Sequence, residues 1–177
     1  MFIQQKYING IFSLALACIL LLMASCEKPK KYSNIPEIKF LDITVTKGFD
    51  ALDNPRHFIN VHFSFTDGDG NLGLDDYDTL GDFSPGEKHY NNIILTFYEK
   101  VNGIIQEKTD IGNLKFRFKN ISKQQTTNKL LKGEMKVDMD IDAKKTYADT
   151  CFLEFYIKDR TVNQSNIERT TEIYLNE

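Results

Sequence analysis

The sequence contains no tryptophan, only three cysteines and only three histidines. A zinc site usually needs three or four nitrogen and sulfur ligands. His57 and His62 stand five residues apart in a segment of alternating hydrophobicity, so they would lie on opposite faces of a strand. His89 stands alone in a segment typical of a loop. These few histidines therefore give no reason to predict a zinc site.

The sequence also lacks the motifs of nucleophilic catalysis. It has no Gly-x-Ser-x-Gly segment, and Ser84, which precedes Pro85 and Gly86, is typical of a turn. Cys151 starts an alternating segment and is expected to point into the core, which does not favour a reactive thiolate. Acidic residues are abundant, but no pair of them stands in an apolar context that would raise one pKa. We therefore predict a non-catalytic protein and keep an enzyme with dispersed carboxylates as an alternative.

Neither charge nor hydrophobicity dominates the chain. The formal net charge is −3, which gives no reason to propose a nucleic acid as a partner. The long apolar run lies at residues 11–23 and is too short to cross a bilayer, which takes about 20 apolar residues. It follows Lys6 and precedes Met23-Ala24-Ser25-Cys26, which resembles the site where a lipoprotein is acylated and cleaved.

We therefore expect residues 1–25 to be a lipoprotein signal peptide and Cys26 to become the lipid-modified first residue. An ordinary secretory signal cut near Ser25 and an uncleaved anchor helix are the alternatives. With Cys18 removed and Cys26 acylated, Cys151 has no partner for an intramolecular disulfide. The exported domain must then depend on a hydrophobic core. Residues 26–36 have two prolines and three lysines, as in a mobile tether that lies beside lipid headgroups or is simply solvated.

From residue 38 onward the hydrophobic pattern has a period of two, which is typical of strands with one solvated face. In residues 38–45 the phase slips between Phe40 and Leu41, which predicts a bulge. We expect residues 37–177 to form a single all-β domain, an antiparallel two-sheet sandwich of immunoglobulin-like type, with a closed barrel as the alternative. The other predicted strands are residues 57–66, 92–100, 114–119, 134–142, 151–158 and 172–175.

The most specific motif is acidic. Residues 57–87 contain seven acids and no Lys or Arg, and residues 67–78 read DGDGNLGLDDYD. Oxygen ligands recur there at alternate positions, as a calcium loop requires. The segment resembles an EF-hand loop, with Leu72 in the usual place of Gly and with Asp instead of Glu at its twelfth position. A metal-free turn rich in Asx and Gly is the alternative. The candidate Ca²⁺ ligands are Asp67, Asp69, Asn71, Gly73, Asp75 and Asp78.

Two further surface features bear on partners. Residues 111–133 contain six Lys or Arg and no acid, so they could face lipid headgroups, an anionic glycan or an acidic protein, or form an ordinary solvated face. Aromatic residues on polar strand faces could form a carbohydrate platform if they share one face, or could be partly buried at sheet edges. These aromatic residues are Tyr98, Phe152, Tyr156 and Tyr174.

Several blocks of the mature chain occur in an order that resembles small lipoproteins of Bacteroidetes-type bacteria, a family without a characterised function. The blocks begin with FSFTDGDGNLGL at residues 63–74 and end with YIKDRTVNQSN at residues 156–166. Residues 157–165 are also similar to the D-x-x-G-N-x-S turn of bacterial immunoglobulin-like domains, with Val162 in the usual place of Gly. The resemblance implies an outer-membrane location, on either face, and a sandwich fold.

Together these patterns predict a non-catalytic lipoprotein of the outer membrane. It would be held by lipid at Cys26, carry a structural calcium loop, and act as an interaction or accessory module for an envelope protein or glycan. A lipoprotein that captures a glycan or small ligand is the alternative.

Overall fold

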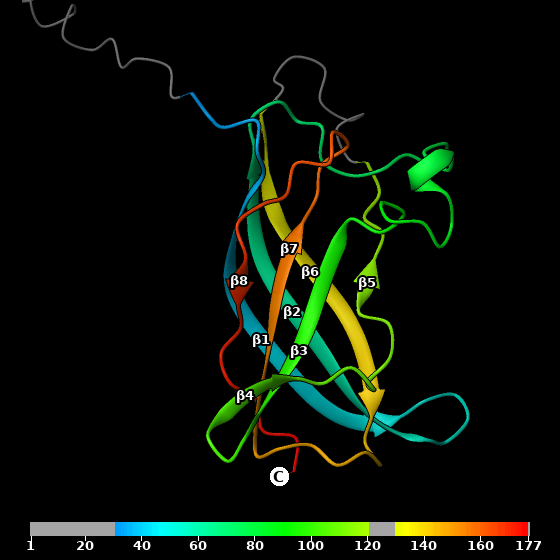
Figure 1. The fold of residues 1–177 in the computed structure, drawn as a ribbon, viewed down its shortest axis with the longest axis vertical. Coiled ribbons are helices and arrows are strands. Elements are labelled where there is room, and N and C mark those ends of the chain that lie inside the picture. The colour runs from blue at the N-terminus through cyan, green and yellow to red at the C-terminus, as the bar shows by residue number, and fades with distance from the viewer. Residues whose placement is uncertain (1–30, 121–129, 177) are drawn as a thin grey trace, which may run out of the picture. The chain divides into compact units, whose positions relative to one another are not determined.

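A computed structural model describes residues 31–120 and 130–176, and within them the chain forms strands and one short 3₁₀ turn but no α-helix (Figure 1). The proposed signal peptide and Cys26 lie outside the described residues. The strands are β1 (Glu37–Phe49), β2 (Pro55–Asp67), β3 (Ile93–Val101), β4 (Ile104–Glu107), β5 (Lys115–Phe116), β6 (Leu131–Asp142), β7 (Thr150–Ile157) and β8 (Glu168–Arg169), and the 3₁₀ turn η1 is Gly81–Phe83.

The first sheet has the order β1-β2-β6, and both of its strand pairs are antiparallel. β1 pairs with β2 along its whole length, with one register shift between Phe40 and Asp42. This shift confirms the bulge predicted from the slip in the apolar pattern. Strands of this length bring the end of β2 at Asp67 beside the start of β6 at Leu131.

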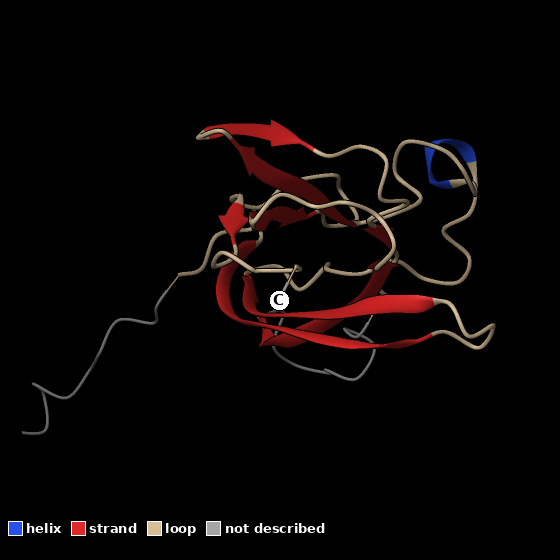
Figure 2. Cartoon of the chain, turned by 90° about the horizontal axis from the view of Figure 1, so that it is seen from below, coloured by secondary structure: helices blue, strands red, loops and turns tan. Residues whose placement is uncertain are grey.

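The second sheet has the order β4-β3-β7-β8, and β5 pairs with the first half of β3 on the same side as β4. The two sheets form the two layers seen from below in Figure 2. β1, β2 and β6 occupy the places of strands A, B and E of an immunoglobulin-like sandwich, and β3, β7 and β8 occupy those of C, F and G. The predicted all-β, antiparallel, two-sheet fold is therefore confirmed.

The core lies between the inward faces of the two sheets. Phe63 of β2 and Phe155 of β7 meet there with ring centroids 5.1 Å apart. Each such ring contributes about 2–3 kcal/mol when it is fully buried. The period of two therefore positions the apolar side chains as the sequence predicts. The core side chains on β2, β3, β6 and β7 are Ile59, Val61, Phe63, Phe65, Ile93, Leu95, Phe97, Leu131, Met135, Val137, Met139, Ile141, Cys151, Leu153, Phe155 and Ile157.

Side chains from the β8 region close the free edge of β1. The Asn166 amide accepts a hydrogen bond from the Ile38 N–H (2.8 Å) and donates one to the Ile38 carbonyl (2.9 Å). The Glu168 carboxylate accepts one from the Phe40 N–H (2.9 Å). These contacts satisfy backbone groups that an edge strand otherwise leaves open, and they join the two sheets.

Two details of the sequence-based prediction were wrong. Residues 172–175 do not form a strand; Ile173 makes only an isolated bridge to Cys151, and the strand beside β7 is β8 at Glu168–Arg169. β4 was not predicted, although Asn102 and Gly103 both have positive φ and form the kind of two-residue turn that joins hairpin strands.

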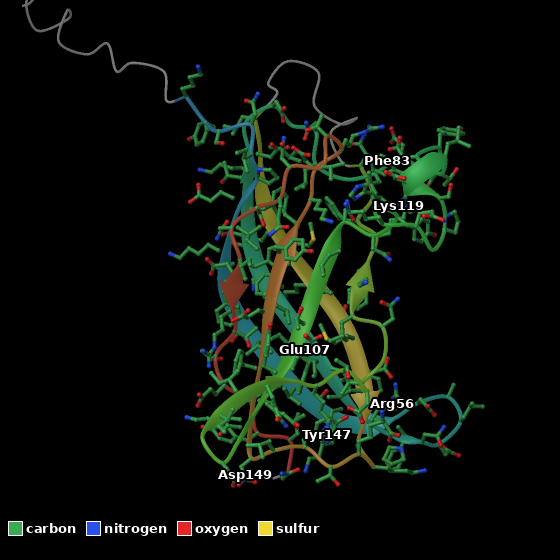
Figure 3. The ribbon with its side chains drawn as sticks, in the orientation of Figure 1. Arg56, Phe83, Glu107, Lys119, Tyr147 and Asp149 are labelled. Carbon is green, nitrogen blue, oxygen red and sulfur yellow. The ribbon has the colours of Figure 1, made fainter. Side chains whose placement is uncertain are left out.

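The described domain has two ends, and each is formed by a different set of loops and turns. The loop pole comprises residues 32–36, the β2–β3 loop (68–92) and the turn after β7 (158–167); Figure 3 shows Phe83 and Lys119 at this end. The hairpin pole comprises the β1–β2 turn (50–54), the β3–β4 turn (102–103) and residues 143–149; Figure 3 shows Arg56, Tyr147 and Asp149 there.

Candidate functional site

The acidic segment begins where β2 ends, at the loop pole. Gly68 packs so tightly that a Cβ there would lie 2.4 Å from the Ser33 carbonyl oxygen, and its N–H donates to that oxygen at 2.8 Å. Gly73 has φ +90°, and a Cβ there would lie 2.5 Å from the Lys119 carbonyl oxygen. Glycine is therefore required at both positions, since no side chain fits between these backbones.

Asp67 is fully buried, with 0% of its surface exposed, and neither of its carboxylate oxygens has a hydrogen-bond partner among the described residues. The next two polar side chains along the loop each use only one polar group. The Asn71 amide nitrogen donates to Asp69 Oδ2 (3.1 Å), which leaves Asp69 Oδ1 and Asn71 Oδ1 buried and without a partner. Four buried oxygens from residues at positions i, i+2 and i+4 are thus unsatisfied, which normally costs about 1–3 kcal/mol or more for each group.

The surroundings of Asp67 oppose a negative charge. Burial, and after it the neighbouring carboxylates of Asp69 and Asp159, raise the pKa of Asp67 to about 7. The Leu72 N–H favours the anion only slightly and does not reach hydrogen-bond geometry. None of the strongest influences on this carboxyl group is a cation. A bound proton or metal ion would therefore reduce the electrostatic cost of the buried Asp67 carboxylate.

The second half of the acidic segment has a protein cation of its own. Arg160, in the turn after β7, contacts the carboxylates of Asp75 (2.9 Å) and Asp78 (2.8 Å). Arg117 donates to the backbone carbonyls of the same two residues (2.8 and 2.9 Å). These contacts divide the five side chains among the six predicted calcium ligands. Asp75 and Asp78 share the Arg160 guanidinium. Asp67, Asp69 and Asn71 are grouped, and among the described residues no cation is paired with them.

The turn after β7 packs against the acidic segment. Leu72 forms a bridge with Asp159, and the Arg160 N–H donates to the Asn71 carbonyl (3.3 Å). The buried Asp159 carboxylate accepts hydrogen bonds from Asn163 and Thr161 within its own turn. Val162 has φ +67°, so the position where related turns carry Gly does require a left-handed backbone.

Sequence reasoning did not identify Asp159, Arg160 or Arg117 as partners of this segment. The pattern around Asp159 predicts only a turn, and nothing in a single sequence says that residues 39 to 85 positions apart will meet. Among the described residues, no three His, Cys, Asp or Glu side chains are close enough to hold a metal ion by themselves. The group at Asp67 differs from such a set because it consists of two carboxylates and a carboxamide.

The aromatic side chains do not form an open platform. Tyr98 and Phe152 share the outward face of the second sheet and stack with centroids 5.2 Å apart. The Arg169 guanidinium covers Phe152 at 3.5 Å from its ring centroid, and the ring is only 1% exposed. Phe152 is therefore buried by its neighbours, as an outward-facing aromatic residue at a sheet edge can be.

Within its described part, the basic segment makes internal contacts. Arg117 also packs over the Tyr90 ring (4.9 Å), and Lys119 contacts Asp76 (3.4 Å). Lys132 lies over the Tyr32 ring (5.3 Å), close to the start of the domain. Lys123 and Lys129 lie outside the described residues. Several of these cations thus hold the loop pole together.

An open pocket of about 350 Å³ at the hairpin pole is lined by another buried carboxylate, that of Glu99. Glu99 accepts a hydrogen bond from Gln106 (3.0 Å) and lies 3.6 Å from the Lys108 ammonium. Tyr147 donates its hydroxyl hydrogen to the Asp142 carbonyl, and burial raises its pKa to about 12. Glu99 and Lys108 of this pocket are therefore already paired with each other.

The remaining reactive side chains lie apart. Cys151 is buried, and burial raises its pKa to about 11. His57 is buried in the core, His62 contacts Glu134 on the outward face of β2 (2.9 Å), and His89 packs against Phe83. Among the described residues, no helix is long and apolar enough to span a membrane.

A scan against protein-family models, a search of curated proteins and a search of solved structures each found no match to this chain.

Proposed function

We propose that this chain is a non-catalytic lipoprotein, held at the outer membrane by lipid on Cys26, and that its sandwich acts as an interaction or accessory module of the envelope. The observation that carries the proposal is the position of residues 32–36. The Gly68 N–H binds the Ser33 carbonyl and Lys132 covers Tyr32, so the amino-terminal segment joins the domain at the loop pole.

This junction determines which pole of the domain lies closer to Cys26. Ser33 lies seven residues after Cys26. Seven residues span at most about 25 Å, so a lipid at Cys26 keeps the loop pole near the bilayer. The hairpin pole is then the end of the domain that can reach farther from the membrane.

The hairpin pole carries exposed apolar side chains suited to a protein partner. Phe49 and Leu52 in and beside the β1–β2 turn are 69% and 82% exposed, and Ile104 at the start of β4 is 69% exposed. Exposed apolar side chains at turn tips are the usual contacts of a recognition surface. An envelope protein therefore fits this end better than a glycan, since Phe152, one of the aromatic side chains that a glycan platform would use, is covered by Arg169.

The anchor is tested with a Cys26→Ala variant of the full chain. The unmodified protein should take up a fatty-acyl label and fractionate with outer membranes, and the variant should do neither. A variant that keeps the label and the membrane fraction would refute the lipid assignment.

The orientation is tested by placing a photo-crosslinking amino acid at Leu52 or at Leu80, which are both 82% exposed but lie at opposite poles. We expect protein crosslinks in intact cells from position 52 and not from position 80. Protein crosslinks from position 80 alone, or equally from both positions, would contradict the proposed presentation of the hairpin pole.

A further inference from the structure

The unsatisfied oxygens at the loop pole are arranged by their neighbours rather than left open by chance. The Asn71 amide nitrogen faces Asp69 Oδ2 (3.1 Å) and Thr161 Oγ1 (3.4 Å), so its own oxygen points elsewhere. The same hydrogen bond fixes the Asp69 carboxylate and leaves its Oδ1 without a partner. Asp67, fully buried, adds both of its oxygens and is close enough to Asp69 for each to feel the other's charge.

From this geometry we propose that Asp67, Asp69 and Asn71 bind one calcium ion at the junction of the β2–β3 loop and the turn after β7. The two Asp67 oxygens, Asp69 Oδ1 and Asn71 Oδ1 supply side-chain ligands. Backbone carbonyls and water complete the six to eight oxygens that calcium takes. This site does not depend on the lipid anchor, so either proposal can fail alone.

A divalent cation explains the set of oxygens better than a proton or a water molecule. One proton shared between Asp67 and Asp69 would serve two of the four oxygens and leave the other two without donors. A buried water can donate to two acceptors but does not offset two negative charges. The ligands are all oxygen, which suits calcium or magnesium rather than zinc or copper. Calcium accepts an irregular protein cage, whereas magnesium demands an octahedron and keeps several of its waters.

Asp159 places a third negative charge beside this group. Its carboxylate influences Asp67 electrostatically, and its orientation is fixed by the Asn163 backbone N–H (2.8 Å) and side-chain amide (2.8 Å). Carboxylates outside the ligand set raise the affinity of a site for a cation and orient its ligands. The ion would therefore hold the loop that follows β2 against the turn that follows β7, and so connect the two sheets at this pole.

The proposed ligand set differs from that of a twelve-residue EF-hand loop. In such a loop Asp75 and Asp78 would bind the same ion, but here both carboxylates contact Arg160. A ligand already paired with a guanidinium would have to break that pair to reach the metal. The two ligand sets can be distinguished by experiment, because only the twelve-residue loop uses Asp78 as a ligand.

The experiment measures thermal unfolding of the full chain in a non-ionic detergent, with calcium chloride or with EDTA, together with calcium binding by calorimetry. Asp67→Asn preserves shape and removes charge, and Asp78→Asn is the matched control on the same loop. We expect calcium to raise the Tm of the unmodified protein and of Asp78→Asn by several degrees, because it binds only the folded state. We expect no rise for Asp67→Asn and a smaller rise with magnesium for the unmodified protein.

Three results would overturn the proposal: no response of the unmodified protein at millimolar calcium, a full response of Asp67→Asn, or loss of the response in Asp78→Asn. Loss in both variants would support the twelve-residue loop instead. Asp69→Asn is the second test of the ligand set if Asp67→Asn does not fold. It too should abolish calcium binding, and retained binding would refute the assignment.

Discussion

Replacing Gly73 by alanine tests how tightly the acidic segment is built into the fold. The substitution places a Cβ on a backbone with φ +90°, 2.5 Å from the Lys119 carbonyl oxygen and 2.7 Å from the Asn120 Cα. Both neighbours are backbone atoms and cannot rotate away. They are held by hydrogen bonds from the Leu74 N–H to the Phe118 carbonyl (2.9 Å) and from the Asn120 N–H to the Leu74 carbonyl (3.1 Å).

The expected loss of stability has two parts. A non-glycine residue at this φ costs roughly 1–2 kcal/mol. Forcing the two backbones apart adds about 1–3 kcal/mol, as overpacking does elsewhere. The sum is about 2–5 kcal/mol, which corresponds to a fall in Tm of roughly 5–15 °C for a domain of this size.

Gly86 provides a matched control because its φ is +91° and nothing lies within 4 Å of a Cβ built there. Gly86→Ala should therefore lose only the conformational part, about 1–2 kcal/mol. The assay is urea denaturation of both variants with EDTA present, so that no metal contributes. Equal losses at the two positions would refute the claim that the Lys119 backbone confines Gly73.

Three further predictions concern other parts of the domain. Val162→Gly should stabilise the protein by about 1 kcal/mol, because it relieves a β-branched residue at φ +67°; an unchanged urea midpoint would show that Val162 is not strained. Burial and the nearby charge of Lys47 lower the pKa of His57. The stability that its neutral imidazole contributes to the fold should therefore be complete above pH 6.5 and be lost as the pH falls below that value. His57→Leu should therefore lose less stability than the unmodified protein between pH 7.5 and pH 5.5, with His62→Leu as the control, and parallel losses would contradict this. Cys151 should react with a thiol reagent at pH 8 only after unfolding, since it is buried and its pKa is raised to about 11; rapid labelling of the native protein would show that the site opens.

The sequence was most informative where the structure depends on local pattern. Alternation placed Phe63 in the core and Lys136 outside, because a strand exposes successive side chains on opposite faces. It failed for β8, whose residues Glu168 and Arg169 are polar and are held by pairing with β7 rather than by burial. Ile173 and Leu175 are buried, as their pattern suggests. Burial alone does not make a strand, however, and Ile173 forms only an isolated bridge.

The candidate site was predicted in part for the same reason. The spacing of Asp67, Asp69 and Asn71 is a local property, and the structure does group these three side chains. The partner of Asp75 and Asp78 is Arg160, and that contact depends on how the two sheets pack. A motif read from one segment cannot include a cation supplied by another. The sequence therefore assigned Asp75 and Asp78 to the same ion as Asp67, Asp69 and Asn71, whereas the structure pairs Asp75 and Asp78 with Arg160.

β1 starts four residues after Ser33 and ends at Phe49, beside the exposed Leu52. It therefore runs from the loop pole to the hairpin pole as one strand of about 40 Å. If a partner bound the β1–β2 turn while the lipid stayed inserted in the membrane, mechanical tension would pass along the covalent backbone of β1. The hydrogen bonds and core of the other strands would carry little of that pull. A partner that gripped the β3–β4 hairpin instead would load the contacts between the sheets, and the domain would yield at a lower force.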